Sequence, residues 1–293
     1  GTPFDYEMYK FWESFFIKKE FISNSKKLAE INLIPMAGEG SRFKKEGYNV
    51  LKPLIQIGKK SMFIKSSQTF PNAIKWIFIF KDSKKLKNSN LIQIIDETFT
   101  LNKIITINKT TSGQAATCLL AKQDLNLNKS LFIASCDYMT IYNERKWENE
   151  INNKEIDVFI WTFKTKNIIV KNHKAFAYCK IDEETGIVKQ IIEKEIVSDS
   201  PENDHMVVGS FWFRRSNDFI QSAENSVFNK IDVNGEHYIG NSLNYLIGKG
   251  KKIKIFEIEK WISFGNPFEL EIYNYWEDYF YMKDGRKPFK ANI

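Results

Sequence analysis

Cysteine and histidine are scarce in this sequence, with three of each among 293 residues. The cysteines stand at Cys118, Cys136 and Cys179, so they are odd in number and far apart. This pattern favours reduced thiols in a cytoplasmic protein over a disulfide framework. Neither residue type has the spacing of zinc ligands, so we assign neither a metal-binding role.

Long apolar runs are also missing. No stretch of 18 or more apolar residues occurs, so we expect no membrane-spanning segment. No signal peptide is visible either. With 43% hydrophobic and 27% charged residues, the composition is typical of a globular enzyme, and the length suits one large α/β domain or two modest ones.

Lysine dominates the charge, and the formal net charge is +7. The lysines are scattered along the chain rather than gathered in one stripe, so we expect no nucleic-acid partner. A modest positive field would still attract anionic nucleotides.

Short apolar runs alternate with helix-like stretches from residue 31 onward. Expected strands of the first half lie at 31–36, 75–80, 102–107 and 130–135, and expected helices at 61–70 and 112–123. This alternation predicts an α/β fold in which a Rossmann-like, mostly parallel sheet is flanked by helices.

The second half of the chain predicts a smaller, more antiparallel portion. Expected strands lie at 157–163, 175–181, 186–193, 206–214 and 252–258, and expected helices at 216–228 and 237–248. Turn residues between the second and third of these strands indicate a hairpin. We interpret this portion as the part that binds the substrate.

The two ends of the chain repeat each other. Residues 1–19 read GTPFDYEMYKFWESFFIKK and residues 265–283 read GNPFELEIYNYWEDYFYMK, with nine of nineteen positions identical. Each segment predicts a Gly-x-Pro turn followed by an aromatic helix. We interpret 1–28 as an aromatic helix left from a preceding, related domain, 29–270 as the main domain and 271–293 as a helical tail. The alternatives are a duplicated helix that packs beside its copy, and a homo-oligomer.

A glycine-rich turn follows the first expected strand and reads Ala37-Gly38-Glu39-Gly40-Ser41. Successive backbone N–H groups of such a turn can hold an anion, and glycine allows the backbone to approach it closely. Arg42 would add a forked donor for phosphate oxygens, and Lys52 a point charge. The turn is neither a Walker A motif nor GxGxxG, and a plain tight turn is the alternative.

This turn, followed ten residues after Arg42 by Lys52-Pro53-Leu54, resembles the opening motif of the sugar-phosphate nucleotidyltransferases, the pyrophosphorylase family. It is most similar to the branch found in bacterial surface-polysaccharide clusters. Leu51 stands where that family has a proline. Further similar segments follow in the family's order, at 112–116, 133–137, 186–194, 208–213, 234–238 and 265–267.

The resemblance implies a nucleotide-diphospho-sugar transferase fold over 29–270 and a reaction between an NTP and a phosphorylated small molecule, with Mg²⁺ as cofactor. Asp137 would hold the Mg²⁺, Arg42 the β- and γ-phosphates, and Lys52 the charge near the α-phosphate. The resemblance places the nucleotide at Ala37, Gly38, Gly40, Ser41, Gly113 and Gln114, and the substrate at Glu193, Lys194, Gly209 and Glu236.

Each assigned residue also has a purely structural alternative. Asp137 would then form a turn, Arg42 and Lys52 would be solvated, and Gln114 would begin a helix. Glu193-Lys194 would end an exposed strand, and Glu236 would cap a helix.

One position departs from the family's pattern. Ser263 stands where many relatives carry a second metal-binding aspartate. Mg²⁺ keeps several waters and uses few carboxylates, so Asp137 with phosphates and water would suffice; otherwise activity is reduced. The competing functions are a nucleotide-sugar-dependent glycosyltransferase and a catalytically silent nucleotide-binding domain of a tandem protein.

Overall fold

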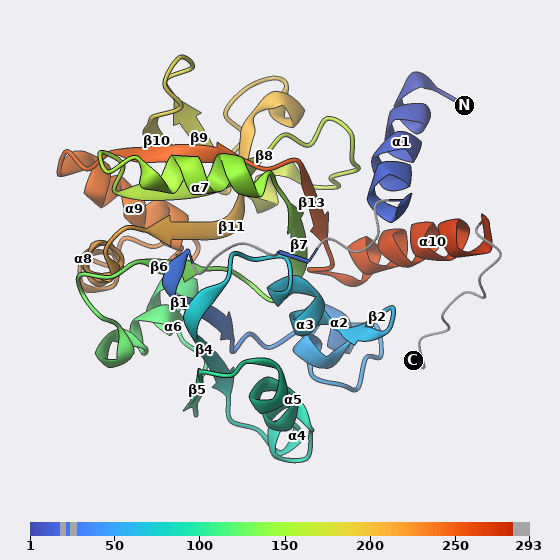
Figure 1. Cartoon of the computed structure of the whole chain (residues 1–293), viewed down its shortest axis with the longest axis horizontal. Coiled ribbons are helices and arrows are strands. Elements are labelled where there is room, and N and C mark those ends of the chain that lie inside the picture. Colours follow the sequence, from blue (N-terminus) through green and yellow to red (C-terminus); the bar gives the residue numbers. More distant parts are fainter. Residues whose placement is uncertain (18–21, 24–27, 284–293) are drawn as a thin grey trace.

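The computed structural model describes residues 1–17, 22–23 and 28–283 of the chain (Figure 1). Parts of two expected segments therefore lie outside the described residues, namely 18–21 and 24–27 of the N-terminal segment and 284–293 of the tail. Among the described helices, none combines the length and the apolar character that crossing a membrane requires.

Within the described residues the main sheet has nine strands, in the order β10-β9-β11-β6-β1-β4-β5, with β8 paired to β11 and β12 paired to β8. The strands are β1 (Ala29–Met36), β4 (Ala73–Lys81), β5 (Asn102–Ile107), β6 (Leu131–Ile133), β8 (Val158–Phe163), β9 (Ala177–Ile181), β10 (Val188–Glu193), β11 (His205–Phe213) and β12 (Ile253–Glu257).

The first half of the chain forms the parallel part of this sheet. β1 pairs in parallel with β4 and β6, and β4 with β5. Six of the eight residues of β1 are buried, as is typical of a strand covered on both faces. The expected α/β class and its parallel central strands are confirmed.

The second half adds the antiparallel portion. β11 runs antiparallel to β6, β8 and β9, and β9 and β10 form the expected hairpin. Gly186 turns the chain between these two strands with φ +70°, a conformation that favours glycine.

Helices cover both faces of the sheet. They are α2 (Ser41–Lys45), α3 (Met62–Ser67), α4 (Lys84–Lys87), α5 (Leu91–Thr98), α6 (Gln114–Leu119), α7 (Glu144–Asn152), α8 (Ser216–Phe228) and α9 (Ile239–Gly248). Alternate residues of β1 point to opposite faces, so that Leu33 joins one apolar cluster with α6, α8 and α9, whereas Ile34 joins another with α3, α5 and α7.

Two small sheets complete the fold. β2 (Gln56–Ile57) pairs with β3 (Lys60–Ser61), and β7 (Tyr138–Ile141) pairs antiparallel with β13 (Lys260–Ser263). The second pair is important for the site because it brings the chain after β13 to the carboxyl end of β6.

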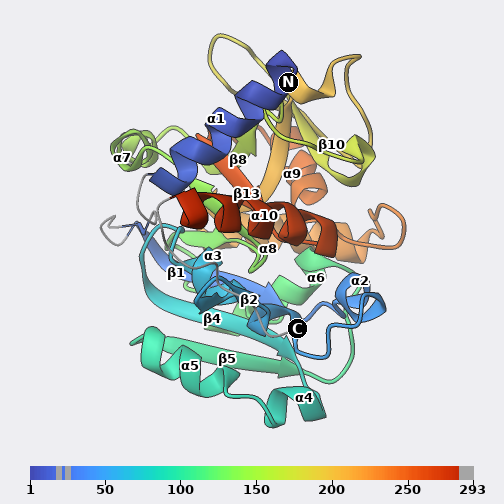
Figure 2. The same ribbon diagram turned by 90° about the vertical axis from the view of Figure 1, so that its right-hand side faces the viewer.

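The two repeated aromatic segments are both helical, as α1 (Pro3–Ile17) and α10 (Pro267–Lys283). They lie beside each other at one side of the molecule (Figure 2). Trp12 of α1 and Tyr273 of α10 belong to the same buried apolar cluster as α3 and α5. The division of the chain into domains remains a prediction.

Candidate active site

The glycine-rich turn leaves the sheet at the carboxyl end of β1. Ala37 is still buried, whereas Gly38 is exposed and Ser41 and Arg42 begin the exposed first turn of α2. Gly40 has φ +61°, and a Cβ there would lie 3.3 Å from the Cβ of Lys52. Both the conformation and the close approach to Lys52 therefore favour glycine at position 40.

Lys52 and Asp137 form an ion pair beside this turn. The Lys52 Nζ atom donates to Asp137 Oδ2 at 2.6 Å and to the carbonyl oxygen of Gly265 at 3.3 Å. β6 neighbours β1 in parallel, so Asp137 lies at the same sheet edge as the turn. Burial opposes the charge on Lys52, but the adjacent Asp137 carboxylate outweighs it and raises the pKa of Lys52.

A pocket of about 230 Å³ opens between the turn and Lys52. Its lining includes Gly38, Gly40 and Lys52, together with Lys81 from the end of β4. Hydrogen bonds from Lys81, Thr110 and Lys44 lower the pKa of Glu39 to about 2. The one acid of the turn is thus already paired, and the pocket keeps a positive charge that suits an anion.

A second carboxylate, from Glu269 on the first turn of α10, lies near Asp137. A Cβ built on Gly265 would be 3.2 Å from Glu269 Oε2 and 3.5 Å from Asp137 Oδ2. Ser263 Oγ donates to Glu269 Oε2 at 2.5 Å. Sequence reasoning missed Glu269, although Asn266-Pro267-Phe268-Glu269 carries the signature of a helix start.

These oxygen donors fit a hard cation. Asp137 and Glu269 supply carboxylates and Ser263 a hydroxyl, the ligand types that Mg²⁺ accepts. In the described part of the chain, no group of three or more His, Cys, Asp or Glu side chains is arranged to hold a metal ion. A cation here would therefore depend on substrate phosphates and water for its remaining ligands.

The segment with Gly113 and Gln114 is fixed to the start of α9. Gly113 has φ +106°, and a Cβ there would lie 2.5 Å from the backbone nitrogen of His237. The His237 N–H donates to Ser112 O at 2.7 Å, and the Ala115 N–H donates to His237 O at 2.9 Å. Position 113 must therefore be glycine, and Gln114 lies next to the segment that carries Glu236.

The predicted substrate residues Glu193, Lys194 and Glu236 form one cluster with Tyr238. The Lys194 Nζ atom lies 5.0 Å from the ring centroid of Tyr238 and donates to Ala175 O at 2.6 Å. The Tyr238 hydroxyl donates to Glu236. Burial raises the pKa of Glu193 to about 7, with Lys194 acting against the rise and Glu236 adding to it.

Gly209 lies on β11 between the residues that pair with β9 and those that pair with β6. It has φ +90°, and a Cβ there would meet the ring of Tyr138 at 3.7 Å. Tyr138 follows Asp137 directly and makes a hydrogen bond of 2.7 Å with Ser210. Gly209 is thus packed against the residue that follows Asp137, on a strand that joins β6 to β9.

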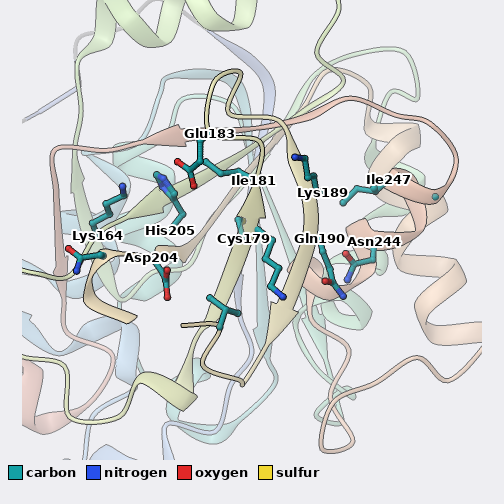
Figure 3. A pocket seen from close by; sticks show the side chains of 14 residues that line it. Lys164, Cys179, Ile181, Glu183, Lys189, Gln190, Asp204, His205, Asn244 and Ile247 are labelled. Carbon is teal, nitrogen blue, oxygen red and sulfur yellow. The ribbon is translucent and has the colours of Figure 1, made fainter. Parts of the chain in front are cut away.

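A larger pocket, of about 830 Å³, lies elsewhere, over β9, β10 and the end of α9. Lys164 and His205 stand on one side of it, and Lys189 and Asn244 on the other (Figure 3). Burial and the charge of Lys164 lower the pKa of His205. None of the predicted site residues lines this pocket, so its size does not make it the candidate site.

Comparison with solved structures identifies proteins with the same fold. A nucleoside-diphosphate-sugar pyrophosphorylase from Vibrio cholerae superposes with a TM-score of 0.67 and 22% identity, over 83% of this chain and 98% of that one. The chain shares its fold with the nucleotide-sugar pyrophosphorylases. No family model and no curated protein matches the sequence.

Two further solved structures have the same fold. An inositol-1-phosphate CTP transferase from T. maritima has a TM-score of 0.65 and 12% identity, covering 91% of this chain and 99% of that one. A UDP-glucose pyrophosphorylase complexed with UDP-glucose has a TM-score of 0.64 and 15% identity, covering 87% and 99%. At such identities the comparisons establish the fold.

Proposed function

We propose that this chain is a nucleotidyltransferase that joins the NMP part of an NTP to a sugar 1-phosphate, or to a similar phosphorylated small molecule, and releases pyrophosphate. The product would be an activated precursor for a bacterial surface polysaccharide, made in the cytoplasm. The sharing of one fold by enzymes named for UDP-glucose and for inositol 1-phosphate supports an acceptor of this class.

The observation that carries the proposal is the Lys52–Asp137 pair beside the glycine turn. Ligands of open α/β sheets bind outside the carboxyl ends of the strands, where this pair lies. Lys52 is held within 2.6 Å of Asp137 and against the backbone of Gly40 and Gly265. A lysine, a carboxylate and a glycine-rich turn thus meet at one point, which would suit a phosphate chain bound together with a metal ion.

The reaction needs no side-chain nucleophile. A phosphate oxygen of the acceptor forms a bond to the α-phosphorus, and the bond from that phosphorus to the bridging oxygen of the β-phosphate breaks. The electron pair stays on the departing pyrophosphate. Arg42 and the N–H groups of the turn would orient the β- and γ-phosphates, and Lys52 would stabilise the charge that develops at the α-phosphate.

Mg²⁺ bound at Asp137 would neutralise phosphate charge when present. Glu269, placed by the β7–β13 pairing, would take the part of the acid that position 263 lacks, with the Ser263 hydroxyl fixing its orientation. At the other end, Lys194 would bind the acceptor's phosphate, and Glu193 and Glu236 its hydroxyl groups. Gln114, beside Glu236, would contact the base.

The decisive test is pyrophosphate release from a matrix of NTPs and sugar 1-phosphates, with inositol 1-phosphate included. We expect one pair to support turnover in the wild type, and Asp137→Asn to lower that turnover strongly while leaving the circular dichroism spectrum unchanged. NTP binding without turnover on any acceptor would instead identify a silent binding domain. Transfer of a sugar from a nucleotide sugar, without pyrophosphate, would identify a glycosyltransferase.

A further inference from the structure

The α1–α10 contact is symmetric in a way that the repeat alone does not require. A shift of 264 residues converts α1 into α10, so Tyr9 corresponds to Tyr273, Trp12 to Trp276 and Phe16 to Phe280. The Trp12 and Trp276 rings stack at 6.3 Å, as do Phe16 and Phe280 at 5.5 Å. Each of these rings therefore meets its own counterpart.

The remaining contacts come in exchanged pairs. Tyr9 lies 6.1 Å from Trp276, and Trp12 lies 6.2 Å from Tyr273. Tyr9 lies 5.8 Å from Phe280, and Phe16 lies 5.7 Å from Tyr273. In these contacts, wherever one residue of α1 contacts a second residue of α10, the α10 counterpart of the first also contacts the α1 counterpart of the second. This exchange is the pattern of a twofold interface between two like subunits.

A polar pair follows the same rule. The Tyr9 hydroxyl donates to Glu13 at 2.7 Å, and the Tyr273 hydroxyl donates to Glu277 at 2.9 Å. On α10 this pair is buried in the core, where Lys65 donates to Tyr273 at 2.7 Å. On α1 the Glu13 side chain is 31% exposed. The Tyr–Glu pair is thus buried in a core on α10 but not on α1.

At two other positions, a residue that is buried on one helix has an exposed counterpart on the other. α10 turns Leu270 into the core at 1% exposure, but its counterpart Tyr6 on α1 is 61% exposed. α1 covers Phe11 at 6% exposure, against Phe163 and under Lys260, but its counterpart Tyr275 on α10 is 63% exposed. At each of these two paired positions, one helix is therefore buried and the other is exposed to solvent.

We propose that α1 is the closing helix of a second nucleotidyltransferase-fold domain that precedes this one in the natural protein. That domain covers Tyr6 and Tyr9 as the present core covers Leu270 and Tyr273. Its equivalents of Phe163 and Lys260 cover Tyr275. The two domains are related by the twofold axis that passes between Trp12 and Trp276.

A separate second copy of this chain does not fit these exposed faces. A core can bind the Tyr6 face of α1 only if no helix already occupies that position. In each copy of this chain, its own α10 occupies the position. Only a domain whose closing helix is α1 itself satisfies both open faces at once. The exposed aromatic side chains are then an interface and not an isolated surface patch.

The test uses the protein expressed from its complete natural reading frame. Benzoylphenylalanine replaces Tyr275, and a control places it at Phe228, which is 86% exposed at the end of α8. After irradiation, we expect a cross-link within one chain from position 275 to a peptide that precedes α1, and none from position 228. A reading frame without a nucleotidyltransferase-fold domain before α1, a cross-link between two chains, or no cross-link at 275 would overturn the proposal.

Nitration of tyrosines gives an independent readout. In the 293-residue chain, Tyr6 and Tyr275 should react readily with tetranitromethane, since both are more than half exposed. In the complete protein their modification should fall severalfold, whereas Tyr245 on α9 should react equally in both. Equal reactivity of Tyr6 and Tyr275 in the two proteins would contradict a covered interface.

Discussion

The two ends of the candidate site differ in how firmly their charges are fixed. At the phosphate end, the Asp137 carboxylate raises the pKa of Lys52, and lysine and threonine donors lower the pKa of Glu39 to about 2. At the acceptor end, burial raises the pKa of Glu193 to about 7. The first end therefore keeps its charges across the neutral range, and the second changes its charge within it.

This difference follows from the strands that build each end. The phosphate end uses the carboxyl edge of parallel strands, where a basic and an acidic side chain meet directly. The acceptor end uses the antiparallel β10 and the start of α9, where Glu193 lies over Gly240, with Oε2 3.5 Å from a Cβ built there. Charges that stay fixed would suit the proposed triphosphate, and a charge that changes near neutral pH would suit the proposed acceptor.

Removal of the negative charge of Asp137 should have the largest effect on turnover. Asp137→Asn keeps the size of the side chain but removes its charge, so we expect kcat to fall about 10³-fold, as for loss of a preorganised electrostatic contact. Steady-state pyrophosphate release measures this, and Asp124→Asn, which breaks a partly exposed ion pair with Lys103, should leave kcat unchanged. Full activity of Asp137→Asn would remove Asp137 from the mechanism.

Arg42 should act on the NTP alone. Arg42→Ala removes charge-assisted hydrogen bonds worth about 1.5 to 3 kcal/mol, which corresponds to a rise of about 10- to 100-fold in the KM for NTP. The KM for the acceptor should stay constant, because Lys194 lies at the other end. Lys45→Ala on the same short helix is the matched control, and an unchanged KM for NTP in Arg42→Ala would refute the assignment.

Much of the fold was predictable because local pattern and tertiary position agree. The expected strand at 102–107 and helix at 216–228 match β5 and α8 at both ends. The helix expected at 112–123 is shorter, since α6 ends at Leu119 and a 3-10 turn follows at Lys122–Asp124. Apolar periodicity locates such elements well but defines their ends poorly.

The phosphate end was also predictable in part, because its glycines and Lys52 are close in sequence. Glu269 was not, since its position at the start of a helix suggests only a role at that helix. It reaches Asp137 through the pairing of β7 with β13, two short strands that are 119 residues apart, measured from Ile141 to Lys260. No local pattern reports a contact of this kind.

Glu269 should have a moderate effect that tests the metal site directly. Glu269→Gln keeps the hydrogen bond to Ser263 but removes one carboxylate, so we expect Mg²⁺ or Mn²⁺ to bind about tenfold more weakly in the presence of NTP. Titration calorimetry measures this without turnover. Glu271→Gln, exposed on the same helix, should bind the metal as the wild type does. Equal affinity in Glu269→Gln would leave Asp137 as the single proposed carboxylate.

The smallest effect should come from Glu193, and it should depend on pH. In the folded chain Glu193 holds its proton to about pH 7, whereas the unfolded chain releases it near 4.5. The folded state therefore binds more protons between these values, and its stability falls as pH rises through that window. Glu193→Gln cannot ionise, so it should be more stable relative to wild type at pH 8 than at pH 5.

Urea unfolding at the two pH values measures this difference, with the exposed Glu195→Gln as control. In activity, the ionised Glu193 accepts hydroxyl hydrogen bonds more strongly than the protonated form does, so the acceptor KM of wild type should fall severalfold from pH 6 to 8 relative to that of Glu193→Gln. Dividing the acceptor KM of wild type by that of Glu193→Gln at each pH cancels the effect of the acceptor's own phosphate, which titrates equally with both enzymes. Because the phosphate end keeps its charges, the KM for NTP should show the same pH profile in both; a divergence there would mean that the two ends titrate together.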